Sequence, residues 1–269
     1  MTLQAVGSVL AETGTPLEVI VVDNASSDGS AEALRATYPH ITVIDAGKNG
    51  GFSFANNIGL SRATGDVLMF LNSDTIVAPG VLARMAAFLA EHPAVGLVGP
   101  RLTFPDGRFQ TASFRNLPDI RSSSFYLLGL EWLNIRLGGK PYKDAGDPAV
   151  SRKAEALSGA AIMFRRSVYE KIGGLDERFF MYGEDLDFCK RAGDLGFGIW
   201  YLAEATIIHF GGESSKRRKF GALADFHRAS WLYYKKHFAP HNGPLANAAV
   251  FVGLKAVCVL SFLRNLFRF

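Results

Sequence analysis

The chain of 269 residues has few cysteines, and the two that it has, Cys189 and Cys258, lie far apart in unlike surroundings. A disulfide framework needs several cysteines, and a cysteine metal site needs them closely spaced. The sequence offers neither arrangement. Such sparse cysteine usage is typical of a reducing compartment, so we expect a cytosolic protein.

Concentrated positive charge is also scarce. The net charge is +4 at pH 7 and the isoelectric point is about 9.1. Nucleic-acid-binding domains gather Lys and Arg into a patch or stripe, whereas here the one tight basic run is Lys216–Lys219. The sequence therefore argues against a nucleic-acid partner. The short run suits anionic phosphates or a membrane surface, and equally a solvated loop.

The first residues lack the basic and apolar segments of a signal peptide, which argues against secretion. Residues 246–263, in contrast, are mostly apolar but are interrupted by Asn247, Gly253 and Lys255. A membrane-spanning helix needs about 20 mainly apolar residues. We therefore expect an interfacial helix, with a buried core helix as the alternative. This segment, residues 241–269, is set apart from a main domain of residues 1–240.

With 48% hydrophobic and 20% charged residues, the chain can bury a sizeable core. Its apolar pattern alternates between helical and extended segments. Predicted helices cover residues 2–13, 31–37 and 80–91, and predicted strands cover residues 17–22, 41–44, 67–71 and 95–98. Such alternation predicts an α/β fold with a mainly parallel central sheet and helices on both faces.

The predicted strand Val67–Leu71 runs into a polar turn that contains Asn72 and Asp74. In open α/β sheets, ligands bind beyond the carboxyl ends of the strands. A carboxylate at that place suits a divalent cation that holds a diphosphate. Taken alone, Asp74 fits equally well as a cap of the turn or of the next helix.

The second half of the chain is less regular. Residues 100–152 are rich in turn-forming residues and are interpreted as a binding loop or lid. A strand is predicted at residues 156–164 and another at 199–208, the latter followed by His209. Between them, the sequence Gly183–Asp187 places three carboxylates at a helix start, where the helix dipole favours negative charge.

This ordered set of segments resembles the family 2 inverting glycosyltransferases with a GT-A (Rossmann-like) fold. More narrowly, it is similar to the rhamnosyltransferase-like enzymes that build bacterial cell-surface polysaccharides. The resembling segments are Val21–Gly29, Asn49–Phe52, Leu71–Asp74, Ser158–Ala160 and Gly174–Asp185. The resemblance covers residues 3–240 and implies a nucleotide-sugar half, residues 1–99, and an acceptor and catalytic half, residues 100–240.

The resemblance also implies residue roles. It assigns nucleotide-sugar binding to Asp23, Asn24, Ser26, Asn49, Gly51, Asn72 and Asp74. Asp23 would accept hydrogen bonds from the nucleotide base. Asp74 matches the last acid of the family's Asp-x-Asp motif and, with His209, would ligate Mg²⁺ or Mn²⁺. The alternative for His209 is a core position or a contact with phosphate.

The resemblance assigns catalysis to the acidic segment Gly183–Asp187. Asp185 would be the general base that deprotonates an acceptor hydroxyl as it attacks the anomeric carbon. Glu184 is the alternative base, and Glu184 and Asp187 would otherwise orient the acceptor or raise the pKa of Asp185.

The sequence departs from the family pattern in two places. Asn72 stands where the motif has its first acid, which removes one negative charge from the metal site. The chain also begins inside the helix that normally follows the first strand of the fold. We therefore expect the fold to lack that strand and nucleotide-sugar binding to be impaired.

The expected function is transfer of a sugar, a deoxyhexose such as rhamnose, from a nucleoside diphosphate donor to a saccharide or polyprenyl-linked acceptor. The C-terminal segment and the basic run suit peripheral contact with the inner face of the cell membrane. Two alternatives stay open. One is a truncated, catalytically impaired homologue that acts as a binding module, and the other is a nucleotidyltransferase-like enzyme, although no Gly-rich basic loop is found near the N-terminus.

Overall fold

The computed structural model describes residues 1–142, 146–211 and 219–266. The basic run predicted to meet phosphates or a membrane lies outside these residues, apart from Lys219, where a helix begins.

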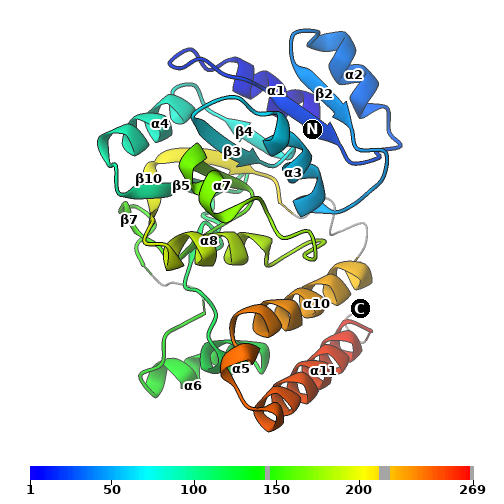
Figure 1. Cartoon of the computed structure of the whole chain (residues 1–269), viewed down its shortest axis with the longest axis vertical. Coiled ribbons are helices and arrows are strands. Elements are labelled where there is room, and N and C mark those ends of the chain that lie inside the picture. The colour runs from blue at the N-terminus through cyan, green and yellow to red at the C-terminus, as the bar shows by residue number, and fades with distance from the viewer. Residues whose placement is uncertain (143–145, 212–218, 267–269) are drawn as a thin grey trace.

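Helices and strands alternate along the first hundred residues, as the apolar pattern predicts (Figure 1). The helices are α1 (Thr2–Leu10), α2 (Ser30–Thr37), α3 (Phe52–Arg62) and α4 (Val81–Glu91). The strands are β1 (Ile20–Asp23), β2 (Thr42–Asp45), β3 (Val67–Leu71), β4 (Thr75–Val77) and β5 (Val95–Thr103).

The rest of the chain completes the sheet and adds a helical end. The short segments of the turn-rich stretch are β6 (Phe114–Arg115), α5 (Ile120–Leu127), α6 (Glu131–Arg136) and β7 (Arg152–Lys153). They are followed by β8 (Ala156–Leu157), β9 (Ala161–Arg165), α7 (Arg166–Ile172), α8 (Glu184–Asp194) and β10 (Gly198–His209). The chain continues as α10 (Lys219–His237), the 3-10 turn η1 (Ala239–His241) and α11 (Pro244–Leu266).

The main sheet has six strands in the order β3-β9-β5-β10-β4, with β7 also paired to β10. Its fold class is the expected α/β arrangement, but the expectation of mainly parallel pairing is wrong. Strands β5 and β10 are parallel, whereas β9 runs antiparallel to both β3 and β5, and β4 runs antiparallel to β10. The physical reason is that β9 enters between β3 and β5 from the opposite end, after the long excursion of residues 100–152.

Strands β1 and β2 form a separate parallel pair. Within the residues that the structure describes, neither strand is hydrogen-bonded to the six-stranded sheet. The carboxyl end of β1 nevertheless presents its polar loop toward the same part of the molecule, because α3 packs against β1 and leads directly into β3.

The core lies on both faces of the main sheet, and side chains alternate between the faces along each strand, as pleated strands require. In β3, Leu68 and Phe70 pack with α3, α7 and α8, whereas Met69 and Leu71 face α1 and α4. Helices therefore cover both faces of the sheet.

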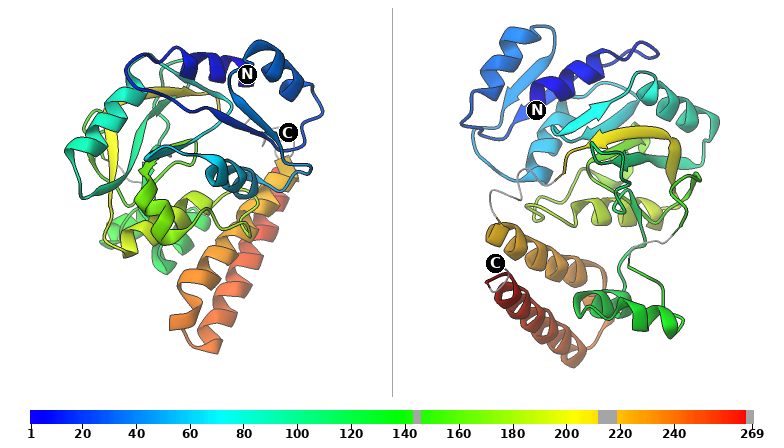
Figure 2. Two further views of the ribbon diagram at one scale, coloured as in Figure 1. Left: turned by 45° about the horizontal axis from the view of Figure 1, so that its top comes forward. Right: turned by 180° about the vertical axis from the view of Figure 1, so that it is seen from behind.

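Helices α10 and α11 form a hairpin below α8, at the end of the molecule away from β1 and β2 (Figures 1 and 2). The Trp231 ring packs on the Phe251 ring with centroids 5.0 Å apart, and the Tyr234 hydroxyl donates to Asn247 Oδ1 at 2.6 Å. By length and composition alone, α11 is apolar enough to cross a membrane, and only 6% of its apolar window is buried. The division at residue 240 and the membrane role of this helix stay predictions.

Candidate functional site

Asp74 and His209 lie side by side because β4 and β10 are paired. Thr75 lies opposite His209 in that antiparallel ladder, which brings His209 Nε2 to 3.3 Å from Asp74 Oδ1. Asn72, at the other end of the same turn, places its Nδ2 3.4 Å from the same imidazole nitrogen. The three side chains assigned to the cation therefore converge.

Gln110 fixes the orientation of His209. The Gln110 Nε2 donates to the His209 carbonyl at 2.5 Å. The other amide atom, Gln110 Oε1, therefore accepts from His209 Nδ1, which lies 2.9 Å away. Nδ1 is thus held by a partner, as in histidines that ligate metals, and Nε2 is the nitrogen that faces Asp74 and Asn72. A cation bound there would take the place of the Nε2 proton.

The charges of this cluster suit a cation. Burial opposes ionisation of Asp74, but the hydrogen bond and charge of His209 and backbone N–H groups outweigh burial and lower the pKa of Asp74. Asn72 Oδ1 is buried and has no hydrogen-bond partner among the described atoms. An ionised carboxylate, an imidazole nitrogen and an orphaned amide oxygen together fit Mg²⁺ or Mn²⁺.

The protein supplies only part of a coordination shell. Among the described residues, no group of three or more His, Cys, Asp and Glu side chains converges on one point. Six-coordinate Mg²⁺ is typically held by one or two carboxylates together with substrate phosphates and water. The cluster therefore suits a cation that is bound jointly with a diphosphate.

The polar loop after β1 is held together by Asn24. Its Nδ2 donates to Asn49 Oδ1 and to the Gly51 carbonyl, at 3.2 and 3.1 Å, and its Oδ1 accepts from Gly50 N–H at 3.0 Å. Asp23 caps the start of the same loop by accepting from Ser26 N–H at 3.2 Å. The five residues predicted around β1 and the Gly50–Gly51 turn to bind the nucleotide sugar are thus brought together at one exposed edge.

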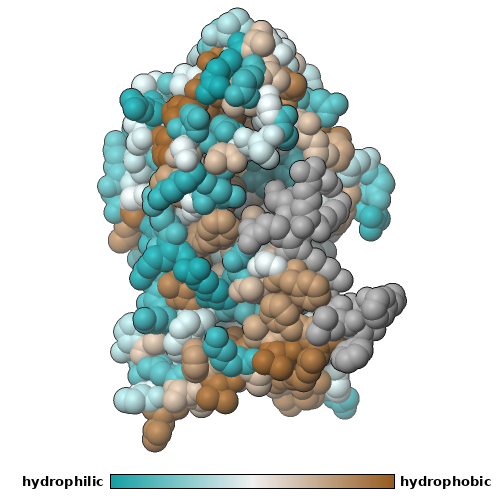
Figure 3. Space-filling model, turned by 90° about the vertical axis from the view of Figure 1, so that its right-hand side faces the viewer, coloured by the Kyte–Doolittle hydropathy of each residue, from teal (hydrophilic) through white to brown (hydrophobic). Residues whose placement is uncertain are grey.

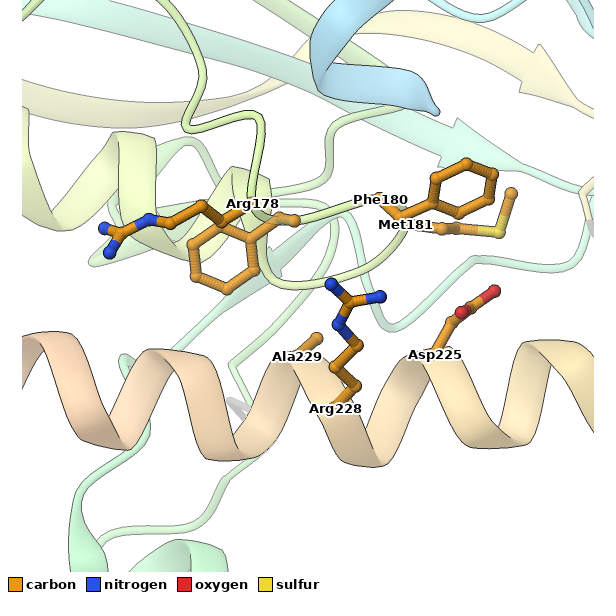
Figure 4. A pocket seen from close by; sticks show the side chains of 7 residues that line it. Arg178, Phe180, Met181, Asp225, Arg228 and Ala229 are labelled. Atoms are coloured by element: carbon orange, nitrogen blue, oxygen red, sulfur yellow. The ribbon is translucent and has the colours of Figure 1, made fainter. Parts of the chain in front are cut away.

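The residues Asp23–Ser26 and Asn49–Gly51 are together called the donor loop. Gly51 connects this donor loop to the loop before α8. Its φ is +89°, and a Cβ there would lie 2.4 Å from the Phe180 carbonyl oxygen, so only glycine fits. Phe52 N–H donates to that oxygen at 2.8 Å. On its other side, the loop borders a narrow cleft against α10, into which Arg228 points toward Phe180 and Met181 (Figure 4).

Asp185 is held as a carboxylate by three donors. Arg115 Nη2 lies 2.5 Å and Gly159 N–H 3.0 Å from its Oδ2, and Leu186 N–H lies 2.8 Å from its Oδ1. Burial disfavours the Arg115 cation, but the adjacent Asp185 charge outweighs burial and raises the pKa of Arg115 above its ordinary value. The pair is therefore ionised at neutral pH.

A short turn joins this ion pair to the cation cluster. The Ala160 carbonyl accepts from Asn72 N–H at 2.9 Å, while the preceding residue, Gly159, donates to Asp185. Asp185 and Asn72 thus bind the backbone of two adjacent residues in one turn. A Cβ at Gly159 would lie 3.4–3.7 Å from Asp185 and Glu184 atoms, which is ordinary van der Waals contact, so this turn lies directly against the two acids.

Glu184 has the opposite charge state from Asp185. Burial, and then the charge of Asp185, raise the pKa of Glu184 to about 8. Its Oε2 has no hydrogen-bond partner among the described atoms. At neutral pH Glu184 is therefore a carboxylic acid, and a buried acid with a raised pKa beside a second carboxyl group is typical of catalytic sites.

Asp187, the third acid of the turn, does not face the site. It is fully buried and pairs with Arg191 on α8 and with Lys236 and His237 on α10, at 2.6–2.8 Å. The expectation that it orients the acceptor is not what its contacts indicate. It instead fastens α10 to α8.

The structure thus groups the predicted residues into a donor loop, a cation cluster and an acid pair. Two residues of the site, Gln110 and Arg115, were not predicted. Both lie in the turn-rich stretch of residues 100–152, where no motif distinguishes a lone Gln or Arg from its neighbours. Only their contacts with His209 and Asp185 identify them.

Known proteins are similar to this chain in sequence. The chain is 29% identical over 233 residues to the N-acetylglucosaminyl-diphospho-decaprenol L-rhamnosyltransferase of Mycobacterium tuberculosis, which covers 82% of this chain and 75% of that protein. It is 28% identical over 247 residues to the O-antigen biosynthesis protein RfbC of Myxococcus xanthus, covering 90% of this chain but 18% of that longer protein.

Solved structures agree on the fold. A mannosyltransferase from Pyrobaculum calidifontis, solved with GDP-Man and Mn²⁺, superposes with a TM-score of 0.58 at 20% identity, covering 95% of this chain and 69% of that one. TarS of S. aureus, solved with UDP-GlcNAc, gives a TM-score of 0.58 at 21% identity, with 94% and 66% covered. The family described as glycosyl transferase family 2 matches residues 1–173. With that match and the GT-A fold, this chain belongs to glycosyltransferase family 2 and is an enzyme, similar to a rhamnosyltransferase.

Proposed function

We propose that this glycosyltransferase transfers a deoxyhexose such as rhamnose from a nucleoside diphosphate donor to a saccharide or lipid-linked acceptor, with inversion at the anomeric carbon. The observation that carries the proposal is the placement of an ionised Asp185 one turn away from the Asp74–His209 cluster. A base and a diphosphate site so placed can act on opposite sides of one sugar.

The donor's nucleoside binds at the loop after β1. Asp23 accepts hydrogen bonds from the base, and the Asn24 network holds Gly50 and Gly51 close to the diphosphate. The absence of a Cβ at both glycines allows this close approach.

Asp74, His209 and Asn72 hold a divalent cation together with the diphosphate. Mn²⁺ or Mg²⁺ would neutralise the negative charge that develops on the leaving diphosphate. The chain's own contribution is the orientation of His209, set by Gln110, and the ionised state of Asp74.

Asp185 takes the proton of the acceptor hydroxyl while that oxygen attacks the anomeric carbon. Its ionised state at neutral pH, secured by Arg115 and two backbone N–H groups, is the state that a general base requires. Glu184 is protonated under the same conditions, so it serves as the alternative base only at higher pH.

A relative and α11 support the proposed acceptor and location. The mycobacterial relative is named for a diphospho-decaprenol acceptor, and α11 of this chain is apolar and mostly exposed. Both observations support action on a lipid-linked acceptor at the cytoplasmic face of the membrane, in the synthesis of a cell-surface polysaccharide.

A transfer assay tests the proposal. The protein is incubated with Mn²⁺, a panel of nucleoside diphosphate sugars that includes rhamnose donors, and soluble and lipid-linked saccharide acceptors. The expected result is one donor that yields nucleoside diphosphate and a glycosylated product of inverted anomeric configuration, with activity lost on chelation. Donor binding without transfer to any acceptor would instead favour the binding module, and nucleotide transfer would favour the nucleotidyltransferase.

A further inference from the structure

A groove of about 530 Å³ begins at the acid pair and runs along the helical end of the protein. At its catalytic end it is lined by Arg115, Glu184 and Asp185, followed by the stacked rings of Tyr126 and Tyr142, whose centroids are 4.3 Å apart. The volume is within the range of about 300–1,000 Å³ typical of ligand sites. The groove is therefore part of the reaction site and large enough for a substrate.

Away from the acid pair, the groove becomes apolar. One face of α11 lines it with Val250, Gly253, Leu254 and Val257, at the three- and four-residue spacing of a helix face. Side chains of α5 and α10 complete the lining. A peptide in this part would leave backbone N–H and C=O groups without partners, which is costly away from water, whereas a hydrocarbon chain needs none.

The other face of α11 is apolar and exposed. Phe251, Val252, Val259 and Leu263 all lie at least 40% open to solvent. The α5–α6 segment adds Leu128 and other exposed apolar side chains at the same end of the molecule (Figure 1). Figure 3 shows apolar residues gathered over this end, below the more polar upper part. Large exposed apolar patches of this kind mark protein or membrane contacts.

We propose that the groove between α5, α10 and α11 holds the hydrocarbon chain of a lipid-linked acceptor, with the saccharide end at Asp185. The inference rests on the proposed transfer reaction and commits it to a lipid substrate. A substrate with a polar head and an apolar tail matches the change from charged to apolar lining along the groove, and the exposed apolar end of the protein lets the tail pass between bilayer and groove.

Gly253 allows a direct test, because a Cβ added to it would meet no atom within 4 Å. Gly253→Leu therefore adds a side chain to the open groove without a clash, and Ala249→Leu is a second variant of the same kind. Gly243→Leu is the matched control, since Gly243 also has open space around it and does not line the groove.

Each protein is assayed with one saccharide carried either on a polyisoprenyl diphosphate in detergent micelles or on a methyl group. The groove variants should raise KM for the lipid acceptor at least about tenfold, which corresponds to excluding roughly two CH₂ groups. Transfer to the methyl glycoside should not change, and Gly243→Leu should behave like wild type with both acceptors. Micelles remove the bilayer, so an effect on KM reports the groove and not membrane docking.

The outcomes separate the inference from the proposed function. A wild-type protein that transfers sugar to neither acceptor overturns both. A wild-type protein that uses the methyl glycoside equally well, or groove variants that change neither acceptor or both alike, overturns the groove assignment alone. If the variants impair only flotation with liposomes, the apolar face binds membrane and the groove does not hold the lipid.

Discussion

Replacing Glu184 by Gln should stabilise the protein increasingly as pH rises. In the folded protein, burial and the Asp185 charge raise the pKa of Glu184 from its ordinary value of 4.5 to about 8. Below pH 4.5 the carboxyl is protonated in both states and costs nothing. Between pH 4.5 and 8 the unfolded chain ionises while the folded protein does not, so stability is lost as pH rises through this window.

The magnitude follows from the size of the shift. At pH 7, which is about 2.5 units above the ordinary pKa of 4.5, ionisation of Glu184 stabilises the unfolded chain but not the folded protein. At 1.36 kcal/mol per unit, this lowers the free energy of unfolding by about 3 kcal/mol. At pH 5 the same difference is below about 1 kcal/mol. Gln keeps the shape but cannot ionise, so Glu184→Gln should escape a loss of about 2.5 kcal/mol between these two pH values.

Urea denaturation at pH 5, 6, 7 and 8 measures the effect, with the free energy of unfolding of wild type subtracted from that of the variant. Glu32→Gln, which removes an exposed carboxylate on α2, is the control and should show no such trend. A difference between Glu184→Gln and wild type that stays constant over this range would mean that Glu184 is ionised in the folded protein. The separation of the two acids would then be wrong.

Three further substitutions test the site and its support. Gln110→Leu removes the acceptor that holds the proton on His209 Nδ1, so affinity for Mn²⁺ with nucleoside diphosphate should fall about 10- to 100-fold by calorimetry; unchanged affinity would refute the role of Gln110. Asp187→Asn leaves Arg191 and Lys236 without their carboxylate partner, so the free energy of unfolding should fall by about 3–5 kcal/mol in a urea titration. A loss below about 1 kcal/mol would contradict the stabilising role of this ion-pair network. Gly51→Ala forces φ +89° on a residue with a Cβ and meets the Phe180 carbonyl, so thermal melts should show about 1–3 kcal/mol of destabilisation together with weaker donor binding; normal donor binding would mean that the two loops need not touch.

Much of the site could be predicted because its chemistry sits at element ends. Asp23, Asp74 and His209 each follow a strand or a turn that the apolar pattern locates, and Glu184 and Asp185 start a helix behind Gly183, whose φ is +82°. Local sequence determines these positions. The charge states of the two acids, however, depend on burial and on Arg115, which lies 70 residues away from Asp185 along the chain.

The sheet illustrates the same limit. Apolar periodicity located β3, β5 and β10 but contains no information on strand direction, because a strand has the same alternation read from either end. Strand β9 was expected as one strand over residues 156–164, yet the turn at Ser158–Ala160 divides it from β8, and β9 pairs antiparallel to both its neighbours. Long-range pairing decided both features.

The most direct test of the account is single-turnover transfer by Asp185→Asn, with donor and Mn²⁺ binding measured on the same protein. The amide keeps one oxygen that can accept from Arg115 and Gly159 but cannot take a proton, so transfer should fall by about 10²- to 10⁴-fold while donor affinity stays close to wild type. Transfer at the wild-type rate would contradict the assignment of Asp185 as the base, and lost donor binding would place Asp185 in the donor site instead.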